Sequence, residues 1–143
     1  MNQILSVKNL VIKFPLQEKL SLFIKNNNFI NAVNGISFTI NKGETLGLVG
    51  ESGCGKTSTL RAIMQLIKPD SGQIIFEGDD LAKLSAVKLQ KIRKDFQMIF
   101  QDPFTSLNPK MSVSSILKEP YIIHQNFKTN ELDDLVNNLL IQV

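Results

Sequence analysis

Hydrophobic and polar residues alternate in two stretches near the start of the chain, a pattern typical of β-strands with one buried face. Residues 4–14 are rich in Leu, Val and Ile and are followed by a proline, so they predict a first strand. Residues 16–28 show no clear period and predict a surface loop. Strand character resumes at Phe29, and residues 36–40 alternate apolar and polar side chains before a turn at 41–43. We therefore expect these strands to be antiparallel and half-buried.

Two later stretches, residues 45–49 and 96–100, are almost continuously apolar, as strands buried on both faces are. A shorter apolar run at 74–76 predicts one more strand between them. Strands that alternate with helices indicate an α/β fold. We therefore expect a core sheet that contains the buried strands, joined to an antiparallel β layer that contains the first ones.

Apolar residues at helical spacing predict the helices. One helix runs to a turn at 69–72, and its apolar face consists of Leu60, Ile63, Met64 and Ile67. Residues 86–92 predict a second helix, and a third begins near Val113 and is stopped by Pro120. A tail helix begins near Glu131, and we expect no packing partner for its apolar stripe. The stripe consists of Leu132, Leu135, Val136, Leu139, Leu140 and Val143.

Composition narrows the class of protein. The 143 residues are enough for one domain, and the hydrophobic share of 43% and charged share of 20% are near globular averages. No apolar run reaches the roughly 18 residues of a membrane-spanning helix, and the start of the chain lacks the layout of a signal peptide, so we expect a cytoplasmic location. The net charge of +3 is spread along the chain, and its densest basic cluster predicts a solvated helix face rather than nucleic-acid contact. That cluster consists of Lys88, Lys91, Arg93 and Lys94.

Residues 50–57 read Gly-Glu-Ser-Gly-Cys-Gly-Lys-Thr and match the P-loop (Walker A) pattern of phosphate-binding loops. Its glycines let consecutive backbone N–H groups point at phosphate oxygens, and the helix that begins near Gly55 adds the positive end of its dipole. Lys56 supplies a cation for the β- and γ-phosphates, and the Thr57 hydroxyl is a ligand for Mg²⁺. The predicted nucleotide-binding set of this loop is Gly50, Glu51, Ser52, Gly53, Cys54, Gly55, Lys56, Thr57 and Ser58.

A P-loop alone does not separate the classes of nucleotide-binding protein. The sequence contains no Asp-x-x-Gly and no Asn-Lys-x-Asp, which a GTPase would use to sense the γ-phosphate and to read guanine, and this argues against a GTPase. Two interpretations stay open for Cys54: a reactive thiol at a helix N-terminus, and a small residue that fills the loop.

The polar loop after residues 96–100 narrows the classes further. It begins with Gln101, and an apolar strand that ends in such a glutamine resembles the Q-loop of ABC-transporter nucleotide-binding domains. Over essentially its whole length the chain is similar to the ATP-binding subunits of oligopeptide and dipeptide importers. The strings that carry this resemblance are residues 32–38, 43–56, 98–103, 106–109 and 119–120.

The resemblance implies roles for individual residues. Phe14 would stack on adenine, with a core-facing phenylalanine as the alternative. Gln101 would ligate Mg²⁺ and orient the attacking water, which makes Lys56 and Gln101 the expected catalytic residues and Thr57 and Gln101 the expected metal ligands. The family also implies ATP as the nucleotide, transmembrane permease subunits docked at the Q-loop and residues 104–123, and a second ATPase subunit. It implies a place on the inner face of the cell membrane, and no nucleic acid is expected as a partner.

The expected domain, residues 1–143, is the amino-terminal portion of one ABC nucleotide-binding domain. Walker A and the Q-loop are present, whereas these residues contain no Leu-Ser-Gly-Gly-Gln signature, Walker B strand or switch histidine of the family. We therefore expect a helical subdomain that is cut short, and a chain that is inactive alone although its family hydrolyses ATP. Two alternatives stay open: a nucleotide-binding module without turnover, and a fragment of a DNA-associated ABC ATPase.

Overall fold

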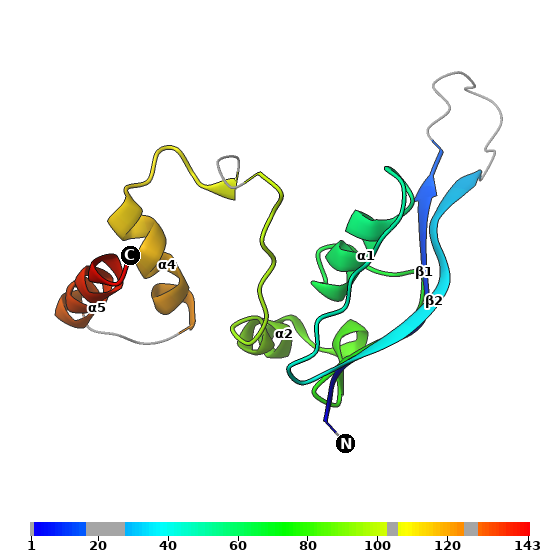
Figure 1. Cartoon of the computed structure of the whole chain (residues 1–143), viewed down its shortest axis with the longest axis horizontal. Helices are drawn as coiled ribbons and strands as arrows, with labels where there is room; N and C mark the ends of the chain where they lie inside the picture. Colours follow the sequence, from blue (N-terminus) through cyan, green and yellow to red (C-terminus); the bar gives the residue numbers. More distant parts are fainter. Residues whose placement is uncertain (1, 17–27, 103–105, 125–128) are drawn as a thin grey trace. The chain divides into compact units, whose positions relative to one another are not determined.

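The computed structural model describes residues 2–16, 28–102, 106–124 and 129–143 (Figure 1). The chain forms two compact units that divide between Leu89 and Gln90. Most of the loop expected at 16–28 lies outside the described residues. None of the helices in the described ranges is long and apolar enough to cross a membrane.

The first unit is built on a four-stranded antiparallel sheet with the strand order β2-β1-β3-β4. β1 (Gln3–Pro15) and β2 (Phe29–Asn41) form a long hairpin, which Figure 1 shows as two strands side by side. β3 (Ser71–Phe76) pairs with the other edge of β1, and the short β4 (Asp79–Asp80) pairs with β3. The antiparallel strands predicted near the start of the chain are thus confirmed, and so is the short strand predicted at 74–76.

A bulge in β1 keeps its apolar residues on one face of the sheet. Asn9 has a positive φ of 48°, and its backbone N–H donates to Ser37 Oγ at 2.8 Å. The extra residue shifts the alternation, so Val7 pairs with Phe38 while Leu10 pairs with Ile36. Because the two partners on β2 are two residues apart, Val7 and Leu10 share a face, and both are buried. This face is the core of the first unit.

Helix α1 (Lys56–Ile63) starts where the sequence predicts but ends earlier. Gln65 has a φ of 53° and donates its N–H to the carbonyl of Ala62, while the N–H of Leu66 donates to the carbonyl of Arg61 at 2.8 Å. These two bonds form a Schellman motif, which turns the chain out of the helix. The predicted stop at 69–72 is therefore wrong, and Ser71 already belongs to β3.

The apolar face predicted for α1 is also wrong in part. Thr59 and Ala62 are the buried residues of the helix, whereas Leu60 is 46% exposed. Ala62 is fully buried because a small side chain allows a helix to approach its neighbours closely.

The strands predicted at 45–49 and 96–100 are absent, although both segments lie within the described residues. Leu46 and Leu48 are about two-fifths exposed, and Val49 and Ile99 are 93% and 94% exposed. A strand buried on both faces needs a paired neighbour, since its N–H and C=O groups have to be satisfied. No strand of the described residues pairs with either segment, so each runs as an extended connection.

A 3-10 turn (Leu81–Lys83) and helix α2 (Ala86–Ile92) follow β4. The predicted second helix is thereby confirmed. All four members of the basic cluster around α2 are exposed, as a solvated face requires.

The second unit contains α4 (Val113–His124) and α5 (Thr129–Ile141), which pack on each other. Pro120 does not stop α4, contrary to the prediction. Proline removes one helix hydrogen bond and crowds the carbonyl four residues earlier, but α4 continues through it, packed on α5 and joined to it by an ion pair from Lys118 to Asp133.

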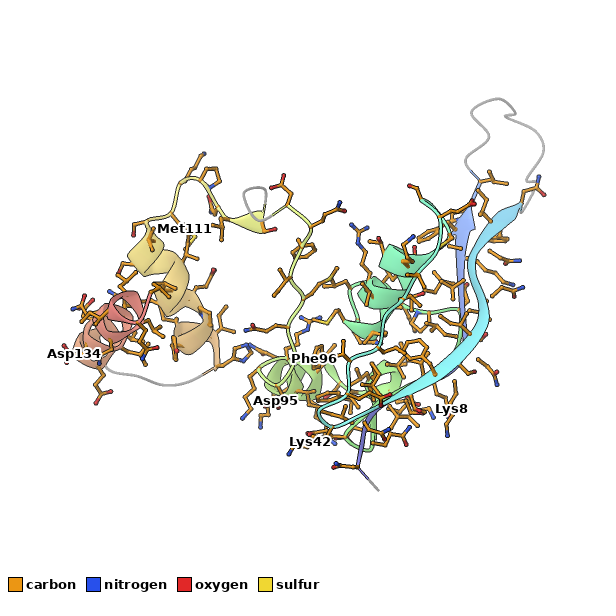
Figure 2. All side chains as sticks on the ribbon, in the orientation of Figure 1. Lys8, Lys42, Asp95, Phe96, Met111 and Asp134 are labelled. Atoms are coloured by element: carbon orange, nitrogen blue, oxygen red, sulfur yellow. The ribbon has the colours of Figure 1, made fainter. Side chains whose placement is uncertain are left out.

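The tail stripe has a partner, and the expectation that it has none is wrong. Leu132 and Val136 are only 7% and 3% exposed. Asp134 lies on the opposite side of α5 and points away from α4 (Figure 2). Leu140 and Val143, at the end of the stripe, remain exposed.

Candidate functional site

The last glycine of the P-loop places the loop against the sheet. Gly55 has a φ of 102° and caps the N-terminus of α1. A Cβ atom at this position would lie 2.2 Å from the backbone oxygen of Ala32 and 3.3 Å from Cγ2 of Val33. Both the left-handed backbone and the close approach to β2 therefore require glycine. The contact brings the start of α1 next to the middle of the hairpin.

The Lys56 ammonium group lies within the curve of the loop. Its Nζ donates to the carbonyl oxygens of Gly50 at 2.6 Å and Glu51 at 2.5 Å, and it contacts Cys54 Sγ at 3.6 Å. The side chain is half-buried, because the loop wraps around its stem. The loop thus holds one positive charge at its centre.

The N-terminus of α1 is free to receive an anion. Gly55 provides no side-chain cap, and the first turn contains no acidic residue. The backbone N–H groups of Lys56, Thr57 and Ser58 have no acceptor within the helix, as at every helix N-terminus. The Thr57 side chain is exposed, while Thr59 is buried and donates its hydroxyl to the Gly55 carbonyl at 3.0 Å. The two threonines therefore differ: Thr57 is available to a ligand, and Thr59 stabilises the turn.

A pocket of about 310 Å³ lies between β2 and the P-loop. This volume is near the lower limit for ligand pockets. Cys54 lines it and also packs against Gly50, where a Cβ atom would lie 2.6 Å from the Cys54 sulfur. The remaining lining includes Ala32, Val33, Leu48, Gly55 and Lys56.

Phe14 lies near the end of β1, one residue before Pro15. Leu10 and Ile12 are buried, but the pairing with β2 shifts register between Ile12 and Lys13, just before Phe14. Ile12 pairs with Val33, which lines the pocket, and Phe14 pairs with Ile30 near the start of β2. The Phe14 side chain is 42% exposed, whereas Leu10 and Ile12 are buried.

Gln101 belongs to the second unit, whereas the P-loop belongs to the first. Its side chain is exposed and follows the extended segment 96–100. Residues 103–105, next in the expected Q-loop, lie outside the described ranges. The prediction that Gln101 reaches a metal and a water stays a prediction.

A second pocket, of about 430 Å³, lies within the second unit. Its lining combines basic residues after α2 with the end of α4, and it contains none of the predicted nucleotide-binding residues. The lining includes Arg93, Lys94, Glu119, Tyr121 and His124.

Sequence reasoning missed Asp70, which it treated only as part of a turn. The Asp70 carboxylate accepts a hydrogen bond from the backbone N–H of Lys13 at 2.6 Å, next to Phe14. The two residues are 57 positions apart. No local pattern could have predicted the contact, because it depends on the pairing of β3 with β1.

The comparisons with known proteins agree with the motif and the fold. Residues 33–142 match the sequence model of a family described as "ABC transporter". Over 141 residues the chain is 45% identical to the oligopeptide transport ATP-binding protein AppF of Bacillus subtilis (strain 168). Over 140 residues it is 41% identical to the glutathione import ATP-binding protein GsiA of Pectobacterium atrosepticum. These matches cover 98% of this chain, but 42% of AppF and 22% of GsiA.

A solved structure of similar fold is the dimeric post-hydrolysis state of the ATP-binding cassette MJ0796 bound to ADP and Pi. The TM-score is 0.76 at 23% identity, over 94% of this chain and 55% of that one. The likeness confirms the expected α/β fold. The match of the family model over most of the chain leads to one further conclusion. The chain belongs to the ABC transporter family.

Proposed function

We propose that this chain binds MgATP at its P-loop and is part of the ATPase subunit of an importer for oligopeptides or small peptides such as glutathione. The observation that carries the proposal is the position of Lys56 Nζ, inside a glycine loop and next to a helix N-terminus without a competing carboxylate. A triphosphate is the ligand that such a site suits best, because backbone N–H groups and a fixed cation both favour it.

A bound phosphate would replace a backbone carbonyl as the hydrogen-bond acceptor of Lys56. In the structure its ammonium group donates to the carbonyl oxygens of Gly50 and Glu51 and contacts Cys54 Sγ. A bound β- or γ-phosphate would accept a hydrogen bond from the ammonium group in place of a carbonyl, and this bond would be stronger because both partners are charged. The lysine therefore needs to move little when the nucleotide binds.

The exposed hydroxyl of Thr57 fits a Mg²⁺ ion that is shared with the nucleotide. Mg²⁺ prefers oxygen ligands and is commonly held by few protein groups together with substrate phosphates. Gln101 would add a side-chain oxygen and orient the attacking water. When bound, the ion would neutralise charge on the transferring phosphoryl group.

Phe14 would stack on the adenine base. Its exposed fraction of 42% supports this role over that of a core-facing side chain. An aromatic face binds any base, so Phe14 would contribute affinity more than selectivity between bases.

Partners and substrate class are proposed from the relatives. AppF is named for oligopeptide transport and GsiA for glutathione import, and MJ0796 was solved as a dimer. We infer a second ATPase subunit, permease subunits that dock near the Q-loop, and attachment to the inner face of the membrane through them.

The proposal is tested by titrating a fluorescent ATP analogue into the wild type, Lys56→Ala and Lys42→Ala. Lys42 is an exposed lysine of the same unit and makes a matched control for the loss of charge. Removing a charge-assisted bond costs about 1.5–3 kcal/mol, so Lys56→Ala should bind about 10- to 150-fold more weakly. Equal affinities of Lys56→Ala and Lys42→Ala would reject the P-loop as the binding site.

A further inference from the structure

The strand that carries Phe14 loses one of its neighbours just before that residue. β2 pairs with β1 along its whole length, from Gln3 to Pro15. β3 pairs with the other edge only from Leu5 to Val11. The end of β1 would therefore have a free edge if nothing else held it.

Asp70, the residue before β3, holds that edge. Its backbone N–H donates to the Val11 carbonyl at 3.0 Å, and its carboxylate oxygen Oδ2 accepts from the Lys13 N–H at 2.6 Å. Val11 and Lys13 point their backbone groups to the same edge, since they are two residues apart on a strand. One aspartate thus extends the ladder by a step, with its side chain in place of a strand carbonyl.

Asp70 links the P-loop side of the proposed nucleotide site, which precedes it on the chain, to β1, the strand that carries Phe14. α1 leaves the P-loop and ends at Ile63, and seven residues later the chain reaches Asp70. The peptide that Asp70 holds joins Ile12 to Lys13. On the other edge, Ile12 pairs with Val33 and Phe14 with Ile30. The backbone around Phe14 is therefore held on both edges, and on the β3 side the carboxylate does so.

We propose that Asp70 is a positioning residue for the nucleotide base: by holding the Lys13 backbone, it orients the Phe14 ring toward adenine. The inference rests on the proposed role of Phe14 as the adenine contact. It predicts that Asp70 variants lose affinity only for ligands that contain the base. Asp70 touches no P-loop residue by any hydrogen bond of the described chain, so the affinity for the triphosphate moiety itself should not change.

The test compares MgATP with magnesium tripolyphosphate, which has the phosphates but no base, by calorimetry on purified protein. The variants are Phe14→Ala, Asp70→Ala, Asp70→Asn, and the double variant Phe14→Ala/Asp70→Ala. Asp79→Ala is the matched control, because Asp79 is an exposed aspartate of the same sheet whose carboxylate makes no hydrogen bond or ion pair within the described residues. Circular dichroism confirms that each variant is folded.

Asp70→Ala should bind MgATP about three- to ten-fold more weakly, which corresponds to one net hydrogen bond, and tripolyphosphate as the wild type does. Asp70→Asn keeps an oxygen acceptor and should restore most of the loss. The double variant should bind no more weakly than Phe14→Ala, because both changes remove the same contact. Asp79→Ala should match the wild type for both ligands.

Four results would overturn the inference. Asp70→Ala could bind MgATP like the wild type while Phe14→Ala binds it weakly. Phe14 would then contact adenine, but Asp70 would not position it. Asp70→Ala could lose affinity for MgATP and tripolyphosphate equally. The losses of MgATP affinity of Phe14→Ala and Asp70→Ala could also add in the double variant. Wild-type affinity of Phe14→Ala would reject the adenine contact itself, and with it this inference.

Discussion

The close approach of Gly55 to β2 predicts that alanine is far more harmful there than at another P-loop glycine. Gly53 is the matched comparison, because its φ of 82° is also left-handed but a Cβ atom would meet nothing within 4 Å. Gly53→Ala therefore adds backbone strain alone. Gly55→Ala adds the same strain, and in addition a Cβ atom 2.2 Å from the Ala32 oxygen.

The two costs can be estimated separately. A left-handed conformation costs a residue with a Cβ atom about 1–2 kcal/mol. The contact at Gly55 is more than half an ångström shorter than Cβ atoms tolerate, and its partner is a backbone atom of a paired strand, which cannot rotate away. Forcing such overlap costs about 1–3 kcal/mol. Gly53→Ala should thus lose about 1–2 kcal/mol of unfolding free energy, and Gly55→Ala about 2–5 kcal/mol.

Equilibrium urea unfolding of the two variants, followed by circular dichroism, measures both values. A change in the midpoint at constant slope reports stability alone. ATP titration of the same samples should show the weaker binding for Gly55→Ala, because the N-terminus of α1 has to move away from β2. Equal unfolding free energies for the two variants would refute the reasoning, since the packing of the loop on Ala32 is the only difference between them.

Two further predictions concern the second unit and turnover. Leu132→Ala truncates a side chain that is 7% exposed and should lower the unfolding free energy by about 2–4 kcal/mol, whereas Leu140→Ala, at a position 47% exposed, should lower it by under about 1 kcal/mol. Urea unfolding measures both values. Equal losses would contradict the packing of α5 on α4. We expect no Walker B glutamate of the family within these 143 residues, and general-base assistance is worth about 10²- to 10⁴-fold. The chain should therefore release phosphate from MgATP no faster than its Lys56→Ala variant. Turnover that depends on Lys56 would show that catalytic groups were overlooked.

Local patterns predicted the antiparallel layer well. The alternation over residues 36–40 is found as half-buried Ile36, Phe38 and Ile40 between exposed Ser37 and Thr39. Such a pattern needs no knowledge of the partner strand, because one buried face is enough to produce it. The bulge at Asn9 could not be predicted in the same way, since a non-glycine residue with positive φ leaves no clear mark in the sequence.

Element ends and doubly buried strands were harder to predict for a physical reason. The Schellman motif after α1 has Gln65 at the position where glycine is usual, so the expected stop signal is missing. Residues 45–49 and 96–100 have the composition of buried strands, but composition records what a segment prefers and not whether a partner is paired with it. In this structure neither has one among the described strands, and both are extended instead.

The phosphate side and the base side of the candidate site differ in how far they depend on contacts between distant residues. The phosphate side is made of consecutive residues: Lys56 contacts carbonyls five and six positions away, and only the Gly55 contact with Ala32 reaches beyond the loop. A motif of eight residues therefore contains nearly all of its geometry. The base side depends on β1, β2 and β3 at once, because Phe14 is held by its pairing with Ile30 and by the bond from Lys13 to Asp70. Substitutions remote from the P-loop should for this reason alter base binding before they alter phosphate binding.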